Sequence, residues 1–317
     1  MGLEIRRWLA GAQAMNQIYL DTARLLTHIA PFVFSDATFA LKGGTAINLF
    51  IRDMPRLSVD LDLVFTDHRV PREQAFARIG EVLRQASERL AARGLQTRTH
   101  ATADATETKL LVRRGPIEVK IEVNFVMRGT VHPVAQASLV PRARDALLAD
   151  LEIPIVSFAD VYGGKLVAAM DRQHPRDLFD VMQLLDYEGI TAEVRRALVI
   201  YLASHNRPVH EVLFPARRDI AQAYERTFKG MTNEPVELKA LLEVRDRMTT
   251  ELQTALDADE RAFLLSLVQN KPDWPRLGVF HAEELPGIRW KLHNLGLLQT
   301  TNPKKFAAQV ESLERLL

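Results

Sequence analysis

The most constraining feature of this sequence is a pair of aspartates inside an apolar segment, Asp60 and Asp62 within residues 57–65. Alternate residues of a β-strand point to the same face, so the two carboxylates are expected side by side. Two neighbouring like charges repel each other, and the apolar residues around them reduce their hydration. A divalent cation would compensate this charge, and oxygen ligands favour Mg²⁺ or Mn²⁺ over zinc. The segment therefore predicts a metal-binding strand.

A second segment offers candidates for a third carboxylate. Residues 117–125 alternate strictly between apolar and polar side chains, which places Glu118, Lys120 and Glu122 on one face of a strand. Taken alone, this pattern is typical of a half-solvated strand. Beside the two aspartates it also fits a two-metal site for phosphoryl or nucleotidyl transfer, which needs about three carboxylates. Either Glu122 or Glu118 could supply the third.

The pattern of apolar residues divides the 317-residue chain into two parts. In the first part we expect helices at 12–30, 46–52 and 72–93 and strands at 59–65, 96–101, 106–113 and 117–125. In the second part we expect helices at 158–171, 175–187, 191–203, 217–227, 237–256, 259–270 and 302–317. The sequence thus predicts an α/β domain over 1–153, with a mixed sheet flanked by helices, followed by an all-helical domain over 154–317.

Composition excludes several kinds of site. The chain contains no cysteine, so disulfides, thiolate zinc sites and cysteine nucleophiles are all ruled out. No apolar run approaches the roughly 20 residues that cross a bilayer, so we expect a cytoplasmic protein that does not enter a membrane. The formal charge of +1 favours no particular class of partner.

Four motifs, taken in order, resemble those of the AbiEii/AbiGii toxin family, which includes the MenT toxins and lies within the DNA-polymerase-β-type nucleotidyltransferase superfamily. The first joins a glycine turn to the aspartate pair and the Glu122 strand, and the other three lie further along the chain. The motifs are Gly43-Gly44-Thr45 with Arg56-x-Ser58-x-Asp60-x-Asp62, then Val161-Tyr162-Gly163-Gly164-Lys165-Leu166, then Arg172-x-x-x-Arg176-Asp177-Leu178-Phe179-Asp180, and finally Pro286-Gly287-Ile288-Arg289-Trp290-Lys291-Leu292. The resemblance covers most of the chain and implies that the α/β domain is a nucleotidyltransferase domain.

The resemblance also implies roles for individual residues. It assigns the metal to Asp60, Asp62 and Glu122, and it adds Lys165 and Asp177 to the catalytic set. Lys165 would neutralise nucleotide phosphates. Asp177 matches an acidic residue of the second domain, with Asp180 one helical turn further on as the alternative. The nucleotide-binding residues implied by the resemblance are Gly43, Gly44, Thr45, Arg56, Ser58 and Lys165.

The resulting expectation is a metal-dependent nucleotidyltransferase, the toxin of a type IV, abortive-infection-like toxin–antitoxin system. It would transfer NMP from an NTP to an acceptor hydroxyl, with release of pyrophosphate. Relatives of the MenT type suggest an RNA acceptor at the tRNA 3′ end and a cognate antitoxin protein, with no DNA partner. Phosphorylation of Ser58 would place negative charge beside the metal carboxylates and disable the site.

Two alternatives use the same residues. One is a nucleotide-binding phosphotransferase or phosphodiesterase, and the other is a catalytically inactive binding module of the same fold. Residues 286–310 also carry Arg289, Lys291, Lys304 and Lys305 without an acidic residue. This stretch is either a solvated helix face or a strip for RNA phosphates, with Trp290 available for stacking.

Overall fold

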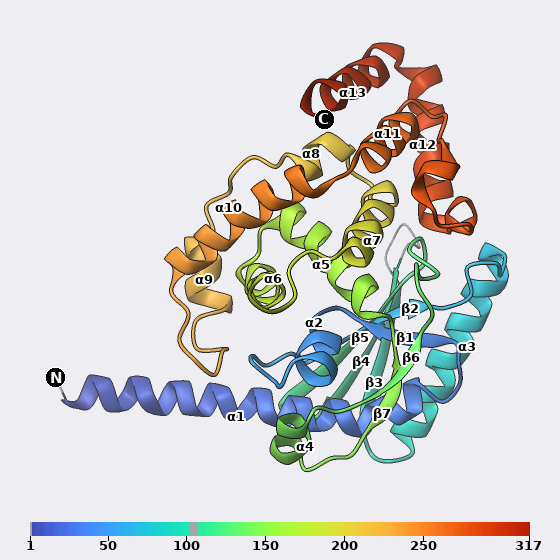
Figure 1. Ribbon diagram of the computed structural model, residues 1–317. Helices are drawn as coiled ribbons and strands as arrows, with labels where there is room; N and C mark the ends of the chain where they lie inside the picture. The colour runs from blue at the N-terminus through green and yellow to red at the C-terminus, as the bar shows by residue number, and fades with distance from the viewer. Residues whose placement is uncertain (1, 102–106) are drawn as a thin grey trace. The chain divides into compact units, whose positions relative to one another are not determined.

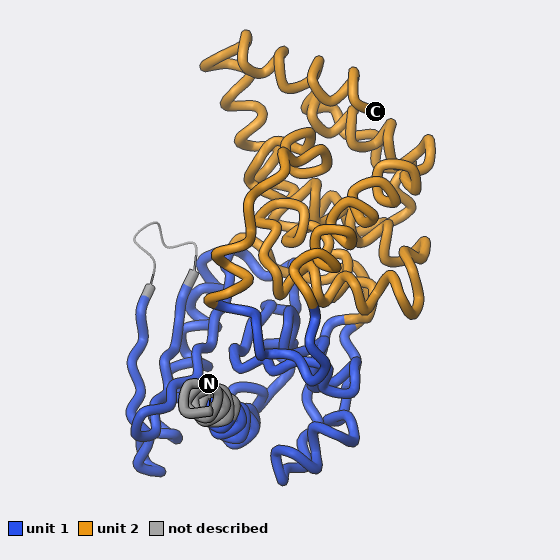
Figure 2. Tube along the Cα trace, turned by 90° about the vertical axis from the view of Figure 1, so that its left-hand side faces the viewer, with its two compact units in different colours: residues 1–125, 134–156, 227–236 blue, residues 126–133, 157–226, 237–317 orange. Residues whose placement is uncertain are grey.

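The structure is a computed structural model that describes residues 2–101 and 107–317 (Figure 1). Its contacts divide the chain into two units, which Figure 2 distinguishes by colour. Unit 1 comprises residues 1–125, 134–156 and 227–236, and unit 2 comprises residues 126–133, 157–226 and 237–317. The predicted class, an α/β part with a mixed sheet followed by a helical part, is confirmed. The domain limits 1–153 and 154–317 stay a prediction, because each contact unit is assembled from separate segments.

Unit 1 is built on one mixed sheet of seven strands in the order β3-β4-β5-β2-β1-β7-β6. The strands are β1 (Phe39–Lys42), β2 (Asp60–Phe65), β3 (Gln96–Ala101), β4 (Glu107–Arg114), β5 (Ile117–Asn124), β6 (Ala135–Ser138) and β7 (Glu152–Ile155). Its helices are α1 (Gly2–Val33), α2 (Gly43–Ala46), the π-helix η1 (Ile47–Ile51), α3 (Arg72–Ala91) and α4 (Pro141–Leu147). The predicted strand 106–113 starts at a residue outside the described ones and is otherwise found as β4.

The centre of the sheet is fixed by strand β2. It pairs in parallel with β5 and antiparallel with β1, so it is flanked on both sides by described strands. Its apolar residues Leu61 and Leu63 are fully buried and lie in register with Ile121 and Val123 of β5. Helix α1 packs against β5 and α3, and this arrangement covers the apolar face (Figure 1). Because side chains alternate, Asp60 and Asp62 project from the other face.

Unit 2 consists mainly of helices, and side chains cap the starts of several of them. The helices are α5 (Phe158–Arg172), α6 (Pro175–Tyr187), α7 (Ala192–Ala203), α8 (Val209–Leu213), α9 (Ala221–Thr227), α10 (Leu238–Ala255), α11 (Ala258–Val268), α12 (Pro286–Thr301) and α13 (Pro303–Leu316), with short 3₁₀ turns η2 (Trp274–Leu277) and η3 (Ala282–Glu284). Ser157 accepts a hydrogen bond from the Asp160 amide at the start of α5, and Asp257 forms a capping box with Glu260 at the start of α11.

The carboxylate of Asp160 also ties the segment 126–133 to the helices of unit 2. It accepts hydrogen bonds from the backbone amides of Val131 and His132, at 2.7 and 2.9 Å. The hydroxyl of the half-buried Tyr201 on α7 donates to the same carboxylate at 3.0 Å. Burial raises the pKa of Tyr201, and the negative charge of Asp160 raises it further, so Tyr201 stays a donor.

Several short elements were not predicted from the sequence. Strands β1, β6 and β7 have four residues each, which is too short for a pattern of period two to be recognised. Strand β6 is largely exposed and has no apolar alternation. Helices α4 and α8 have seven and five residues. Helix α12 was not predicted as a separate helix, although it begins with Pro286 at a position that favours helix starts.

Replacing Gly163 or Gly80 by alanine is expected to change stability in opposite directions. A Cβ at Gly163 on α5 would lie 2.7 Å from the Ala197 Cβ and 2.8 Å from the Leu198 backbone nitrogen on α7, so Gly163→Ala should destabilise the protein by about 2 kcal/mol. Gly80, exposed on α3, has nothing within 4 Å of its Cβ position, so Gly80→Ala should stabilise the helix by about 0.5–1 kcal/mol. Chemical denaturation of both variants measures the two changes. Equal effects of the same sign would contradict the α5–α7 packing.

Candidate active site

The predicted glycine turn lies directly against the aspartate pair. Strand β1 ends at Lys42, which is in register with Asp62, and the chain then turns into α2 at Gly43. Gly43 has a φ of +75°, and a Cβ there would lie 2.6 Å from Asp62 Oδ2. A residue with a side chain would therefore be strained by its backbone and would also collide with the carboxylate. The two sequence features form one local structure.

The residues between the turn and the aspartates are held around Gly44. The Thr45 hydroxyl donates to the Asp60 carbonyl oxygen at 2.5 Å and lies 3.0 Å from the Ser58 hydroxyl. A Cβ at Gly44 would lie 2.8 Å from the Arg56 Nη2 atom and 3.0 Å from the Ser58 Oγ. Arg56 is almost fully buried, and its Nη1 donates to the Leu57 carbonyl. The turn thus combines closely approached backbone, two hydroxyls and a cation, which are groups that suit phosphate oxygens.

Strand register decides between the two candidate glutamates. In the parallel pairing of β2 with β5, Asp62 is in register with Glu122 and Asp60 with Lys120. Glu118 lies beyond the end of this pairing, and its carboxylate pairs with Arg113 on β4 at 3.2 Å. Glu122 is therefore the glutamate that shares the sheet position of the aspartates.

The carboxylate of Glu122 is bound by two lysines that the sequence analysis gave no role. Lys109 on β4 lies 2.5 Å from Oε1, and Lys120 on β5 lies 2.9 Å from Oε2. Burial would raise the pKa of Glu122, but the hydrogen bonds from Lys109 and Lys120 outweigh burial and hold the pKa below its usual value. Lys120 stood on the polar face of its strand in the sequence, whereas the approach of Lys109 depends on the register between β4 and β5.

The three predicted metal ligands share one face of two paired strands, but Glu122 is engaged by lysines. Within residues 2–101 and 107–317, no three histidine or carboxylate side chains gather as a ready group for a metal ion. Asp60 and Asp62 fit a divalent cation by their donor type and by their shared strand face. Glu122 fits as a third ligand only when Lys109 or Lys120 moves away from its carboxylate.

Lys165 and Asp177 form a buried cluster of their own in unit 2. The Lys165 ammonium lies 3.0 Å from Asp177 Oδ1 and 2.9 Å from Asp180 Oδ2, so it contacts both of the aspartates that the sequence left as alternatives. Arg172 adds contacts to Asp177 at 2.5 and 2.9 Å. Burial would raise the pKa of Asp177, but the charges of Lys165 and Arg172 outweigh it and hold that pKa far below its usual value.

One member of the basic stretch at 286–310 does not lie on the surface. Lys291 is buried, and its ammonium donates to the carbonyl oxygens of His205 and Arg207 at 2.9 and 2.6 Å. Burial lowers the pKa of Lys291 to about 8. This lysine joins α12 to the segment after α7, so neither of the two alternatives for residues 286–310, a solvated helix face or a strip for RNA phosphates, describes Lys291. Arg289 and Trp290 are exposed.

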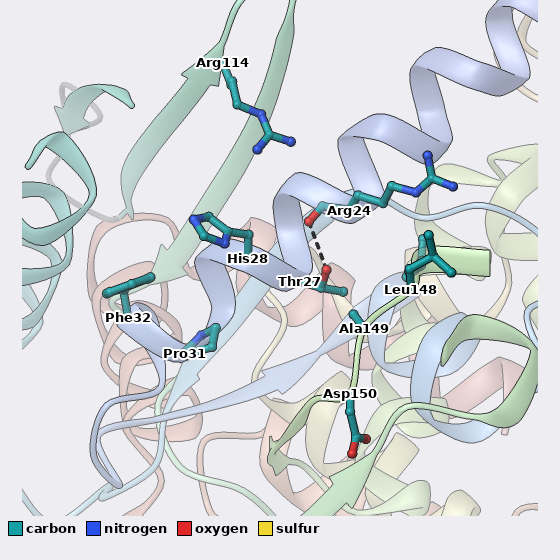
Figure 3. Close-up of a pocket in the computed structure, with 10 residues that line it drawn as sticks. Arg24, Thr27, His28, Pro31, Phe32, Arg114, Leu148, Ala149 and Asp150 are labelled. Carbon is teal, nitrogen blue, oxygen red and sulfur yellow. Dashed lines mark hydrogen bonds between the residues drawn. The ribbon is translucent and has the colours of Figure 1, made fainter. Parts of the chain in front are cut away.

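A groove of about 620 Å³ lies elsewhere in unit 1 (Figure 3). Arg24, His28 and Phe32 line it from α1, and Arg114 and Leu148 line it from the end of β4 and the turn after α4. None of the predicted site residues lines this groove. It is therefore distinct from the candidate active site at the glycine turn.

Comparison with known proteins finds a matching protein family and a similar solved structure. The sequence profile of a family described as the nucleotidyl transferase AbiEii toxin of a type IV toxin–antitoxin system matches residues 24–294. The solved structure of MenT4, a nucleotidyltransferase toxin from Mycobacterium tuberculosis H37Rv, is similar over 88% of this chain and 92% of its own, with a TM-score of 0.58. Its sequence identity of 21% makes this a similarity of fold. No curated protein sequence matches the chain.

The buried cluster around Asp177 predicts a loss of stability in acid. The pKa of Asp177 in the folded protein lies below about 3.9, the value in the unfolded chain. The contribution of Asp177 to stability is therefore complete above about pH 5 and is lost as the pH falls toward its folded-state pKa. At pH 7, Asp177→Asn should cost about 3 kcal/mol, because Lys165 keeps only Asp180 as a carboxylate partner. The difference between the parent and the variant should shrink between pH 5 and 3.

Chemical denaturation as a function of pH measures this difference. The control is Asp67→Asn at the surface, where the carboxylate accepts hydrogen bonds from the side chain and the amide of Arg69, so its effect should be much smaller than that of Asp177→Asn at pH 7. A constant difference between the parent and Asp177→Asn from pH 7 to 3 would show that the cluster does not titrate in this way.

Proposed function

Because the chain belongs to the AbiEii nucleotidyltransferase toxin family, we propose that it transfers NMP from an NTP to an acceptor hydroxyl at the face of β2, with release of pyrophosphate. The observation that carries the proposal is the register of β1, β2 and β5. It places the glycine turn, the two aspartates and Glu122 around one position of the sheet.

Among the described residues, no helix is apolar and long enough to cross a membrane.

In this proposal Asp60, Asp62 and Glu122 would hold two divalent cations, Mg²⁺ or Mn²⁺. When bound, one cation lowers the pKa of the attacking hydroxyl and the other offsets charge on the leaving pyrophosphate. The glycine turn contacts both aspartates. The backbone carbonyl of Asp60 accepts a hydrogen bond from Thr45, and the Asp62 carboxylate lies against Gly43, so the glycine turn and the start of β2 hold each other in position.

The glycine turn is the proposed site for the triphosphate. Gly43 and Gly44 let phosphate oxygens approach the backbone N–H groups, since no Cβ stands in the way. Arg56 and Ser58 lie at the Cβ position of Gly44, where they would bind the same oxygens. Thr45 keeps Ser58 in place through the contact between their hydroxyls. In this proposal these residues bind and orient the triphosphate, and other parts of the chain contact the nucleotide base.

The second unit contributes Lys165 and Asp177 to the proposed catalytic set. Asp177 and Asp180 both contact the Lys165 ammonium, and Arg172 is a second cation on Asp177. A change at either aspartate should therefore act through the position and charge of Lys165.

The acceptor proposed from the resemblance is an RNA, with the tRNA 3′ end as the candidate hydroxyl, and a cognate antitoxin is the expected protein partner. Arg289, Lys304, Lys305 and Trp290 are exposed and offer cations and an aromatic ring to RNA. Blocking the acceptor end of tRNA would stop aminoacylation, which gives a reason for toxicity. Phosphorylation of Ser58 would add negative charge where the nucleotide phosphates are proposed to lie.

Incubation with labelled NTPs and total tRNA tests the proposal. The parent should add label to RNA, and Asp60→Asn and Asp62→Asn should each reduce the rate by at least about a hundredfold, because both carboxylates carry the cation. The control Glu118→Gln, which removes only an exposed pair with Arg113, should stay within about twofold of the parent. Release of label from the NTP without transfer to any acceptor would indicate a phosphodiesterase. Absence of labelling by the parent, together with an Asp60→Asn variant that is as toxic as the parent, would indicate a binding module.

A further inference from the structure

We propose that Lys120 and Lys109 act as an internal counter-cation, which neutralises Glu122 until a divalent cation binds and then passes to the phosphates of the nucleotide. This inference rests on the proposed function, and it gives these two lysines a role that neither the motifs nor the family assigns here. It makes them positioning and specificity residues of the same site. The argument rests on three observations about contacts, register and exposure.

The first observation is that both oxygens of Glu122 are taken, and by different strands. Lys109 comes from β4 and contacts Oε1, while Lys120 comes from β5 and contacts Oε2. An ammonium at such a distance occupies the direction from which a metal ion would approach, and two cations at one oxygen repel each other. Glu122 can therefore join a metal site only by exchanging at least one lysine.

The second observation is that Lys120 faces more than one carboxylate. It is in register with Asp60, and Asp60, Asp62 and Glu122 all attract its ammonium. Lys42 of β1 is a further cation in this region of the sheet, in register with Asp62. A dication placed at the aspartates would add positive charge here and repel the ammonium of Lys120. Cation binding and release of Lys120 are thus expected to be linked.

The third observation is that both lysines have room to move. About a third of each side chain is exposed, 34% for Lys109 and 37% for Lys120, whereas Glu122 is only 16% exposed. A flexible lysine stem can carry its ammonium to a new partner at little cost in packing. The triphosphate brings new negative charge to the glycine turn, and this charge would hold the displaced lysines. The cation and the nucleotide would therefore bind cooperatively.

Mn²⁺ binding without nucleotide, measured by the electron paramagnetic resonance of free Mn²⁺, tests the competition directly. Lys120→Met should bind Mn²⁺ about tenfold more tightly than the parent, because one competing cation is removed. Lys109→Met should shift the affinity in the same direction. The matched control is Arg113→Met, which removes a cross-strand cation from Glu118 on the same two strands and should leave the Mn²⁺ affinity unchanged.

Binding of inorganic pyrophosphate to the Mn²⁺-saturated protein, measured by calorimetry, tests the second half of the inference. Lys120→Met should bind pyrophosphate about tenfold more weakly, although it binds Mn²⁺ more tightly. Opposite shifts in the two affinities are the signature of a lysine that changes partners. A simple loss of packing would not produce them, and thermal unfolding of each variant checks that the fold is kept.

Two outcomes overturn this inference alone, and they differ from failure of the proposed function. If Mn²⁺ affinity in Lys120→Met equals that of the parent and Arg113→Met, the lysine does not compete for Glu122. If pyrophosphate affinity is unchanged in Lys120→Met, the lysine does not pass to phosphate. The proposed function itself fails if the double variant Asp60→Asn, Asp62→Asn binds Mn²⁺ as the parent does. Absence of Mn²⁺ binding in every variant overturns both proposals.

Discussion

The parallel pairing of β2 with β5 is the constraint on which the rest of the site depends. It brings Asp62 beside Glu122 although 59 intervening positions separate them in the chain, and it buries Leu61 and Leu63 with Ile121 and Val123. A shift of one residue in this pairing would turn Asp60 and Asp62 to the apolar face. The burial of apolar side chains that stabilises the sheet therefore also holds the register. Apolar packing on one face therefore determines where negative charge collects on the other.

The carboxylates that gather on this face explain why a glycine lies beside Asp62 and why two lysines contact Glu122. The glycine turn must lack a side chain at Gly43 because the Asp62 carboxylate occupies the space. The lysines on β4 and β5 converge on Glu122 because a half-buried carboxylate beside two others needs cations. The buried group in unit 2 follows the same rule, since Lys165 and Arg172 neutralise Asp177. Glu122 in unit 1 and Asp177 in unit 2 are thus each paired with basic side chains from nearby elements.

The sequence was informative where the physics is local and silent where it depends on pairing between distant segments. Alternation in 57–65 and 117–125 predicted both site strands, and capping residues such as Ser157 marked helix starts. The choice of Glu122 over Glu118 required the register of β2 and β5, and the contact of Lys109 with Glu122 required that of β4 and β5. Lys291 looked like a surface cation because its burial depends on how α12 packs on the segment after α7.

The most direct measurement of the central claim is the anomalous scattering of crystals grown with Mn²⁺ and a non-hydrolysable NTP analogue. The account predicts a manganese peak within about 2.3 Å of carboxylate oxygens of both Asp60 and Asp62, with the triphosphate against Gly43 and Gly44. Lys120 should have left Glu122 for a phosphate oxygen in that complex. A manganese peak away from these aspartates, with both lysines still on Glu122, would contradict the account.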